Sequence, residues 1–230
     1  MSGCTLASQR RCAQRGLSLV EFLVGVAIAL FIAAAAATLF AGNLRENRQL
    51  LLEARLMQDL RTAADIATRD LRRAGYWADS TAGVWAAGAS SVAPNPYVAL
   101  APSGAASDAV SLRYSRDATE NNLVDSNEQF GFRLKNGAIE LQLGAGNWQA
   151  LTDAGTLTIT AFSVTPTLQD IDLGTFCATP CPAGSATCPP HQQVRSLALL
   201  ISGRLVADAS VTRSLRSQIR LRNDPVIGAC

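Results

Sequence analysis

The apolar and polar residues divide the chain into an apolar helix, an amphipathic helix and a series of short strands. Residues 22–42 carry no charged side chain. As an α-helix this segment would be about 31 Å long at 1.5 Å per residue, which is enough to cross the hydrocarbon core of a bilayer. The pattern therefore predicts one transmembrane helix near the start of the chain.

The helical pattern continues through residues 44–74, and no proline precedes Pro94. Apolar residues recur there at spacings of three, four and seven, which favours an amphipathic helix. They are Leu44, Leu51, Leu52, Leu56, Leu60, Ala63, Ala64, Ala67 and Leu71. Gly75 is a natural helix C-cap. We expect one helix from about Leu17 to Ala74, with one stripe of its second half packed on a globular domain.

Further along the chain the apolar residues alternate with polar ones, which indicates β-strands. Asn136-Gly137 between two alternating runs predicts a tight hairpin. Residues 75–108 are expected to be an irregular connection, in which Trp77 and Trp85 serve as anchors. The strands are expected near 110–114, 130–134, 139–143, 157–161, 195–206 and 213–222. The predicted fold class is α+β, a long N-terminal helix packed on an antiparallel β-sheet.

A loop over residues 174–193 is rich in cysteine and proline and is expected to separate the fourth and fifth strands of that sheet. In an oxidising compartment the four cysteines of the C-terminal part, Cys177, Cys181, Cys188 and Cys230, suggest two disulfides with three possible pairings. We expect Cys230 to pair with one of the other three, but the sequence does not decide which.

Two other interpretations of these cysteines are open. One is a zinc site that would include His191, but the cysteine spacing is not a standard zinc pattern. The other is partly free thiols. Cys4 and Cys12 lie in the first 16 residues, before the apolar run. We expect no metal and no cofactor.

The charge balance and the residue types argue against nucleic-acid binding and against catalysis. The chain has 20 Lys+Arg and 18 Asp+Glu, and three of the arginines lie in residues 1–16. Without them 17 basic residues face 18 acidic ones, which does not favour nucleic-acid binding. His191 is the only histidine, and no glycine-rich phosphate loop follows a strand. We therefore expect that the protein is not an enzyme.

The acidic residues of the loops lack the spacing of an EF-hand. We expect their carboxylates to be solvated rather than to bind Ca²⁺. The residues considered are Asp108, Asp117, Asp125, Glu128, Asp170 and Asp172.

The segment Arg15-Gly16-Leu17-Ser18-Leu19-Val20-Glu21 resembles the type IV prepilin signature. In that family a short basic leader ends in Gly, the next residue opens the mature helix, and Glu stands at the fifth mature position. Counted from Leu17, Glu21 is the fifth. The resemblance implies cleavage by prepilin peptidase between Gly16 and Leu17 and N-methylation of Leu17. It also implies that Glu21 pairs with a neighbouring subunit's N-terminus during assembly.

The resemblance divides the chain into a leader (1–16), a transmembrane half-helix (17–43), an exported half-helix (44–75) and a β-rich domain (76–230). The basic leader predicts a cytoplasmic N-terminus and a periplasmic domain at the bacterial inner membrane. A secretory signal is disfavoured because the apolar run is too long and lacks a clean cleavage site. A plain single-pass anchor is the other alternative.

Two further segments narrow the resemblance. Asp70-Leu71-Arg72-Arg73-Ala74-Gly75-Tyr76 resembles the D-x-R-x-A-G-[YF] segment that ends the helix of PilW-type minor pilins, and Leu221-Arg222-Asn223 resembles part of their last strand. The resemblance implies a structural subunit that joins a priming complex and then the pilus, with a place at its tip as one option. The charged side chains of the first segment are expected to be helix-end charges rather than a binding patch.

The implied partners are other minor pilins, the major pilin, prepilin peptidase, the inner-membrane assembly platform and, at the tip, an adhesin. Two alternatives stay open. One is a pseudopilin of the GspJ type in type II secretion, and the other is a minor pilin that acts as an adhesive or DNA-binding module.

Overall fold

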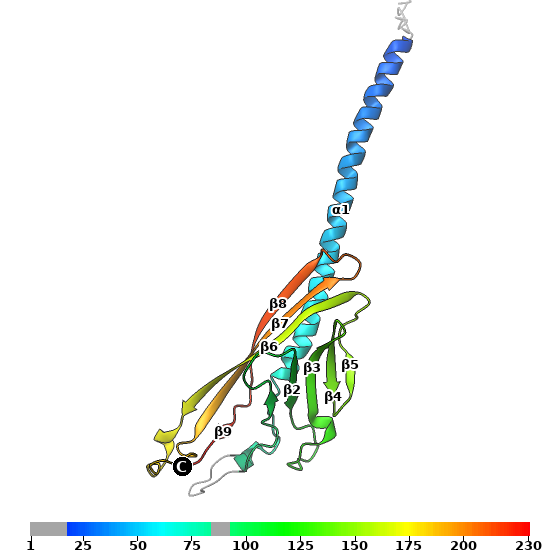
Figure 1. The fold of residues 1–230 in the computed structure, drawn as a ribbon. Coiled ribbons are helices and arrows are strands. Elements are labelled where there is room, and N and C mark those ends of the chain that lie inside the picture. The colour runs from blue at the N-terminus through cyan, green and yellow to red at the C-terminus, as the bar shows by residue number, and fades with distance from the viewer. Residues whose placement is uncertain (1–17, 84–92) are drawn as a thin grey trace, which may run out of the picture. The chain divides into compact units, whose positions relative to one another are not determined.

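The computed structural model describes residues 18–83 and 93–230 and separates into two compact units, Met1–Gln49 and Leu50–Cys230. The expected leader, the cleavage position between Gly16 and Leu17, and Trp85 lie outside the described residues. Both units contain part of one helix, α1 (Leu19–Leu71), which is blue to cyan in Figure 1.

In the first unit, α1 is the only element among the described residues, and all of them are exposed. Among the described residues, α1 is the one helix that is long and apolar enough to cross a membrane. An apolar helix with no buried side chain needs an apolar surrounding, which a bilayer or neighbouring helices can supply.

In the second unit, α1 buries the predicted stripe, but only from Leu56 onward. The buried residues are Leu56, Leu60, Ala63, Ala64, Ala67, Asp70 and Leu71. Leu44 and Leu51 are 54% and 72% exposed, so their expected burial was wrong. The regular spacing of these leucines could not show where along the helix the contact with the globular core begins.

The helix also ends earlier than expected, at Leu71 instead of Ala74. The amides of Arg73 and Ala74 donate to the carbonyls of Asp70 and Leu71, three residues back. Such bonds tighten the last turn of a helix before it ends.

The strands form two antiparallel sheets, which corrects the expectation of a single sheet. The first sheet has the order β1-β2-β3-β4-β5. Its strands are β1 (Leu100–Ala101), β2 (Ala109–Arg113), β3 (Gln129–Lys135), β4 (Ala138–Leu143) and β5 (Trp148–Ala150). An alternating pattern shows which face of a strand is buried, but it does not identify the neighbouring strand.

The second sheet contains β6 (Leu157–Asp172), β7 (His191–Leu205), β8 (Thr212–Arg220) and β9 (Val226–Ile227). β7 is central, because it pairs with β6, β8 and β9. The β6–β7 ladder continues to the pair Asp172 and His191, so the loop expected at 174–193 is shorter than predicted. The distal residues of this hairpin, such as Gln169 and Gln193, are polar, and their strands therefore lack the apolar alternation that sequence patterns detect.

The predicted hairpin at Asn136-Gly137 is confirmed. These residues join β3 to β4, and Lys135 pairs with Ala138. Both turn residues have positive φ, 52° and 74°, as a type I′ turn requires. Three short 3₁₀ helices occur in the described connections: η1 (Ser80–Gly83), η2 (Ser126–Glu128) and η3 (Gly174–Phe176).

The core is one cluster in which the stripe of α1 meets the inner faces of both sheets. Phe130 and Phe132 of β3 and Leu197 and Leu199 of β7 are among the fully buried side chains. This packing places the end of α1 beside the C-terminal segment that follows β8, and the two meet in the junction described below.

Candidate functional site

Glu21 lies in the first turn of α1, where the structure shows a local role for it. The Ser18 amide donates to Glu21 Oε2 at 3.1 Å, and the Val20 amide donates to Ser18 Oγ at 3.3 Å. This pattern is close to a capping box, in which Ser and Glu three residues apart satisfy amides at a helix start, but Ser18 Oγ accepts from the second helical amide and not the third. Sequence reasoning missed it, although Ser18-Leu19-Val20-Glu21 carries its S-x-x-E signal.

Capping leaves Glu21 able to bind another subunit. The side chain is exposed, and only Oε2 takes part in the described bond to Ser18. A carboxylate has two oxygens and about four acceptor sites. The same residue can therefore cap its own helix and accept a hydrogen bond from another chain.

Beyond the other end of α1, Gly75 lies four residues after Leu71, in the turn that follows the helix, and not directly after the helix as expected. Its φ is +75°, in the left-handed region that favours glycine. The Gly75 amide donates to the carbonyl of Arg113 at 2.9 Å, and Asn95 Nδ2 donates to the carbonyl of Gly75 at 2.9 Å. The helix terminus is thus fixed to the end of β2 and to the connection that precedes β1.

The two segments that resemble PilW-type minor pilins are hydrogen-bonded to each other. Asn223 Nδ2 donates to the carbonyls of Ala74, at 3.1 Å, and Arg73, at 3.4 Å. The Arg222 amide donates to the carbonyl of Arg72 at 3.3 Å. These contacts join the C-terminal segment to carbonyls of the turn that follows α1. We call this contact between residues 72–75 and 222–223 the junction.

Arg195 of β7 also forms hydrogen bonds at the junction. Its Nη2 donates to the carbonyl of Asn223 at 3.0 Å and its Nη1 donates to the carbonyl of Val98 at 2.7 Å. Burial lowers the pKa of the Arg195 guanidinium, and the charge of Asp224 opposes that shift. Sequence reasoning did not identify Arg195, because an arginine in a strand pattern is ordinarily a solvated side chain.

The charged residues of the helix end have separate structural roles. The Asp70 side chain is largely buried, and its closest ion-pair contact is Arg69 Nε at 3.8 Å. Burial raises the pKa of the Asp70 carboxyl, although neighbouring arginines act in the opposite direction. The Arg73 guanidinium lies 4.2 Å from the ring centroid of Tyr114, a cation–π distance. Arg72 is exposed.

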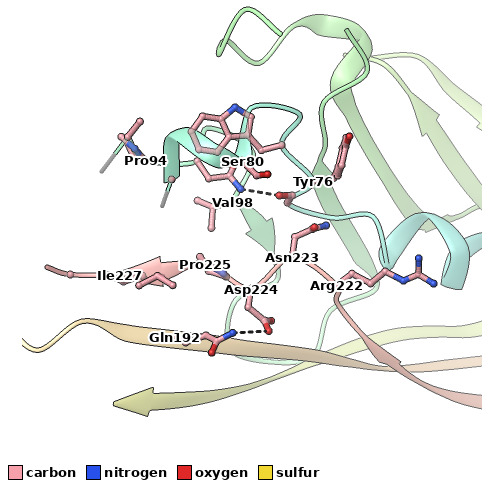
Figure 2. A pocket seen from close by; sticks show the side chains of 17 residues that line it. Tyr76, Ser80, Pro94, Val98, Gln192, Arg222, Asn223, Asp224, Pro225 and Ile227 are labelled. Carbon is pink, nitrogen blue, oxygen red and sulfur yellow. Dashed lines mark hydrogen bonds between the residues drawn. The ribbon is translucent and has the colours of Figure 1, made fainter. Parts of the chain in front are cut away.

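A cavity of about 710 Å³ opens beside the junction. Figure 2 shows Tyr76, Asn223, Asp224 and Gln192 around it, and Gln192 Nε2 contacts Asp224 Oδ2 at 3.5 Å. Its described walls combine amide, carboxylate and apolar side chains.

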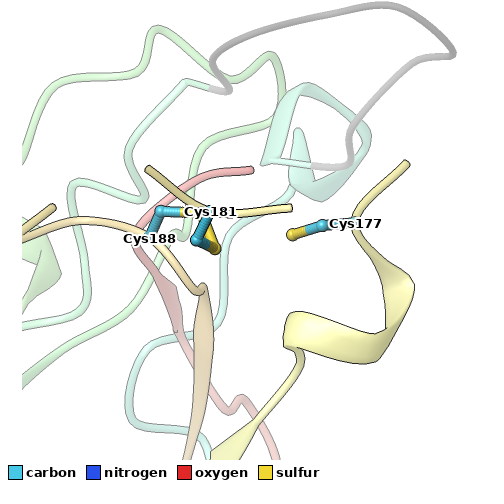
Figure 3. Close-up of side chains that lie close together, drawn as sticks. All are labelled: Cys177, Cys181 and Cys188. Atoms are coloured by element: carbon cyan, nitrogen blue, oxygen red, sulfur yellow. A yellow bond between two sulfur atoms is a disulfide. The ribbon is translucent and has the colours of Figure 1, made fainter. Parts of the chain in front are cut away.

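The cysteines of the C-terminal part lie together. Disulfides join Cys177 to Cys230, with the Cα atoms 5.3 Å apart, and Cys181 to Cys188, with the Cα atoms 5.5 Å apart. The sulfur atoms of Cys177, Cys181 and Cys188 lie within 4.8 Å of one another, as Figure 3 shows for the loop. A metal would require these sulfurs as thiolates, whereas in the structure each of them is part of a disulfide. His191, once considered as a zinc ligand, lies in β7 opposite Asp172 and Ile227.

The acidic residues before β3 differ from the expected solvated loop. Glu128 is fully buried, so the expectation was wrong for this residue. Its carboxylate accepts hydrogen bonds from the Arg116 amide (2.8 Å), the Asp125 amide (2.9 Å) and the Tyr97 hydroxyl (3.0 Å). These donors offset the cost of burying a charge.

Two of the other acidic residues gather around Glu128. Carboxylate oxygens of Asp117, Asp125 and Glu128 lie within 4.8 Å of one another. Burial and the hydrogen bond to Glu120 raise the pKa of the Tyr97 hydroxyl, so Tyr97 is a donor at neutral pH. The network holds the loop to the domain.

The comparisons with known proteins gave one match. Residues 49–221 match the family described as prepilin peptidase-dependent protein B. The match takes in the second part of α1, every strand from β1 to β8 and the first residue of Leu221-Arg222-Asn223. No curated protein and no solved structure matches the chain. Because the matched segment is well over half of the 230 residues, the chain belongs to the prepilin peptidase-dependent protein B family.

Proposed function

We propose that this protein is a minor pilin of the PilW type, a structural subunit that helps to prime assembly of a type IV pilus. The observation that carries the proposal is α1. It has Glu21 in its first turn, no charge from Phe22 to Gly42, and it continues into the domain that matches the family. A filament subunit needs such an apolar helix to stay in the membrane before assembly and to pack against other subunits afterwards.

The role is structural rather than catalytic. Several polar side chains of the described domain, such as Tyr97, Glu128 and Asn223, form hydrogen bonds to other parts of the domain. Tyr97 and Glu128 are both fully buried, which leaves a substrate no access to their oxygens. Arg195 and Asn223 are engaged with backbone carbonyls at the junction.

The proposed location is the bacterial inner membrane and then the pilus. The arginines of residues 1–16 would keep the N-terminus in the cytoplasm. The domain would then be periplasmic, an oxidising compartment that suits the pairs Cys177–Cys230 and Cys181–Cys188. Its partners would be other minor pilins, the major pilin, prepilin peptidase and the assembly platform, and at the tip an adhesin.

A pseudopilin of type II secretion is the second candidate, because the family description names dependence on prepilin peptidase, and this dependence suits both systems. Deletion of the gene in its own bacterium separates the two. Loss of surface pili with normal secretion supports the minor pilin, and loss of secreted enzymes with normal pili supports the pseudopilin.

The test of processing is mass spectrometry of the mature protein purified from its own bacterium. We expect a terminus at N-methylated Leu17. Gly16→Val should block cleavage, because the peptidase must accommodate a side chain in place of none, whereas Gly3→Val in the same leader should be cleaved normally. A mature protein that still begins at Met1, or that begins near residue 38, would refute the proposal.

A further inference from the structure

A second cavity, of about 240 Å³, lies among the segment before and after β1, the distal part of the β6–β7 hairpin, and β9. Its walls include the apolar side chains of Pro166 and Leu168 from β6 and Ile227 from β9. Arg195, which holds the junction, also lines this cavity. A charged guanidinium in a mostly apolar wall indicates a specific polar requirement.

The hydrogen bonds of Arg195 are incomplete. Its two described partners, the carbonyls of Val98 and Asn223, are neutral groups. Its Nε is buried and has no hydrogen-bond partner within the described chain. A buried donor without a partner costs free energy, and such a group needs an explanation such as a bound water or ligand.

Arg195 also lacks a counter-ion. None of the ion pairs among residues 18–83 and 93–230 includes it. The carboxylate that acts on it electrostatically is Asp224. Asp224 is bound through both oxygens by Arg220, at 2.7 and 2.5 Å. Arg195 therefore shares the charge of Asp224 with Arg220 and has no carboxylate of its own at ion-pair distance among the described residues.

We propose that this cavity binds a small carboxylate with an apolar body. The carboxylate accepts from the guanidinium of Arg195 and adds a negative charge beside it, and the apolar body lies against Leu168, Pro166 and Ile227. The volume corresponds to roughly eight water molecules in the liquid, which fits a group of about the size of one aliphatic residue. This proposal does not depend on the pilus function.

The wall composition selects this class of ligand over others. Inorganic phosphate would lose its hydration against Leu168 and Ile227 without gaining apolar contacts. A neutral amide of the same shape would fill the cavity but leave the guanidinium without a counter-charge. A hydrogen bond between charged groups is about twice as strong as a neutral one, so the carboxylate should bind about tenfold more tightly than the amide.

The experiment is a titration of the full-length chain, purified in non-ionic detergent micelles, with N-acetyl-leucine, followed by saturation-transfer NMR. N-acetyl-leucinamide is the matched neutral ligand. Leu168→Trp should fill the cavity and abolish binding, and it should fold because Leu168 is 49% exposed. Val206→Trp, at another exposed position that does not line the cavity, is the control.

We expect N-acetyl-leucine to bind the wild type and Val206→Trp about equally, and to bind Leu168→Trp at least tenfold more weakly. Arg195→Lys keeps the charge but removes the guanidinium N–H groups, and it should reduce the preference for carboxylate over amide. Equal binding of acid and amide, equal binding to Leu168→Trp and wild type, or no binding at millimolar concentration would each overturn the proposal.

Discussion

Asn223 Nδ2 donates to the carbonyl of Ala74 at 3.1 Å, across a sequence separation of 149 residues. The donor comes from the segment after β8 and the acceptor from the turn that follows α1. This hydrogen bond joins the turn after α1 to the segment after β8 of the second sheet.

Removing this side chain should destabilise the domain. Asn223→Ala leaves the Ala74 carbonyl without its donor, and an unsatisfied group at a buried position costs about 1–3 kcal/mol. Asn147→Ala is the control, because Asn147 Nδ2 also donates to a carbonyl, that of Leu143, but at an exposed site. It should cost about 0.5 kcal/mol. Denaturant unfolding followed by near-UV circular dichroism measures both, and equal losses would contradict a special role of the junction.

A methyl group at Gly75 should lower the stability of the domain more than a methyl group at another glycine of the same conformation. Gly75→Ala would place its Cβ 3.0 Å from Arg195 Nη2. Gly146 has a similar φ, +73°, but has open space around it. Gly146→Ala should cost about 1 kcal/mol from the left-handed backbone alone, and Gly75→Ala about 2–3 kcal/mol because Arg195 must also move. Thermal unfolding distinguishes the values, and similar losses would argue against crowding by Arg195.

The two roles of Glu21 can be separated by two substitutions. Glu21→Gln keeps the capping box, because glutamine also accepts the Ser18 amide, but it removes the charge. Glu21→Ala removes both. If assembly depends on the charge, both variants should lose co-purification with other minor pilins to the same extent. If only Glu21→Ala is impaired, the residue acts as a helix cap, and the proposed pairing with a neighbouring N-terminus is wrong.

Asp70 should make the domain less stable as the pH rises. Burial raises its pKa above the ordinary value of 3.8, so the native state binds this proton more tightly than the unfolded state does. The stability that the protonated group contributes is complete below about pH 3.8 and is lost as the pH rises through the native pKa. The melting temperature of Asp70→Asn relative to the wild type should therefore increase from pH 4 to pH 7. Asp65→Asn, on the exposed face of α1, controls for the lost charge, and a difference that falls with pH would refute the assignment.

The two disulfides should contribute unequally. The pair Cys177–Cys230 closes a separation of 53 residues and Cys181–Cys188 one of 7. In the chain-entropy model these loops correspond to about 4 and about 2.4 kcal/mol. The double variant Cys177→Ser/Cys230→Ser should lower the unfolding free energy more than Cys181→Ser/Cys188→Ser. Non-reducing peptide mapping should recover both pairs, and a Cys177–Cys188 or Cys181–Cys230 link would contradict them.

Sequence patterns captured the parts of the fold that depend on near neighbours. The helical stripe near Leu60, the turn at Asn136-Gly137 and the positive φ of Gly75 each follow from the chemistry of a few consecutive residues. The capping box at Ser18 and Glu21 belongs to this class too, and its signal was overlooked because Glu21 was considered only in relation to other subunits.

What the sequence could not show depends on distant residues. The separation into two sheets follows from which strand each edge meets, and alternation along one strand does not encode that choice. The contacts of Arg195 and the burial of Glu128 were not predicted for a related reason. Carbonyls or amides from other segments satisfy each side chain, and such partners cannot be inferred from the residue itself.

The link from Cys177 to the last residue of the chain also determines how the domain responds to tension. β7, β8 and β9 all lie inside this covalent loop. A pulling force that enters through α1 can extend the residues before Cys177, but it cannot draw out the loop itself. At about 3.4 Å per extended residue, the disulfide withholds about 180 Å of chain from stretching. If the protein is a fibre subunit, as proposed, β7, β8 and β9 would thus stay close to Cys177 even when the rest of the domain has been pulled open.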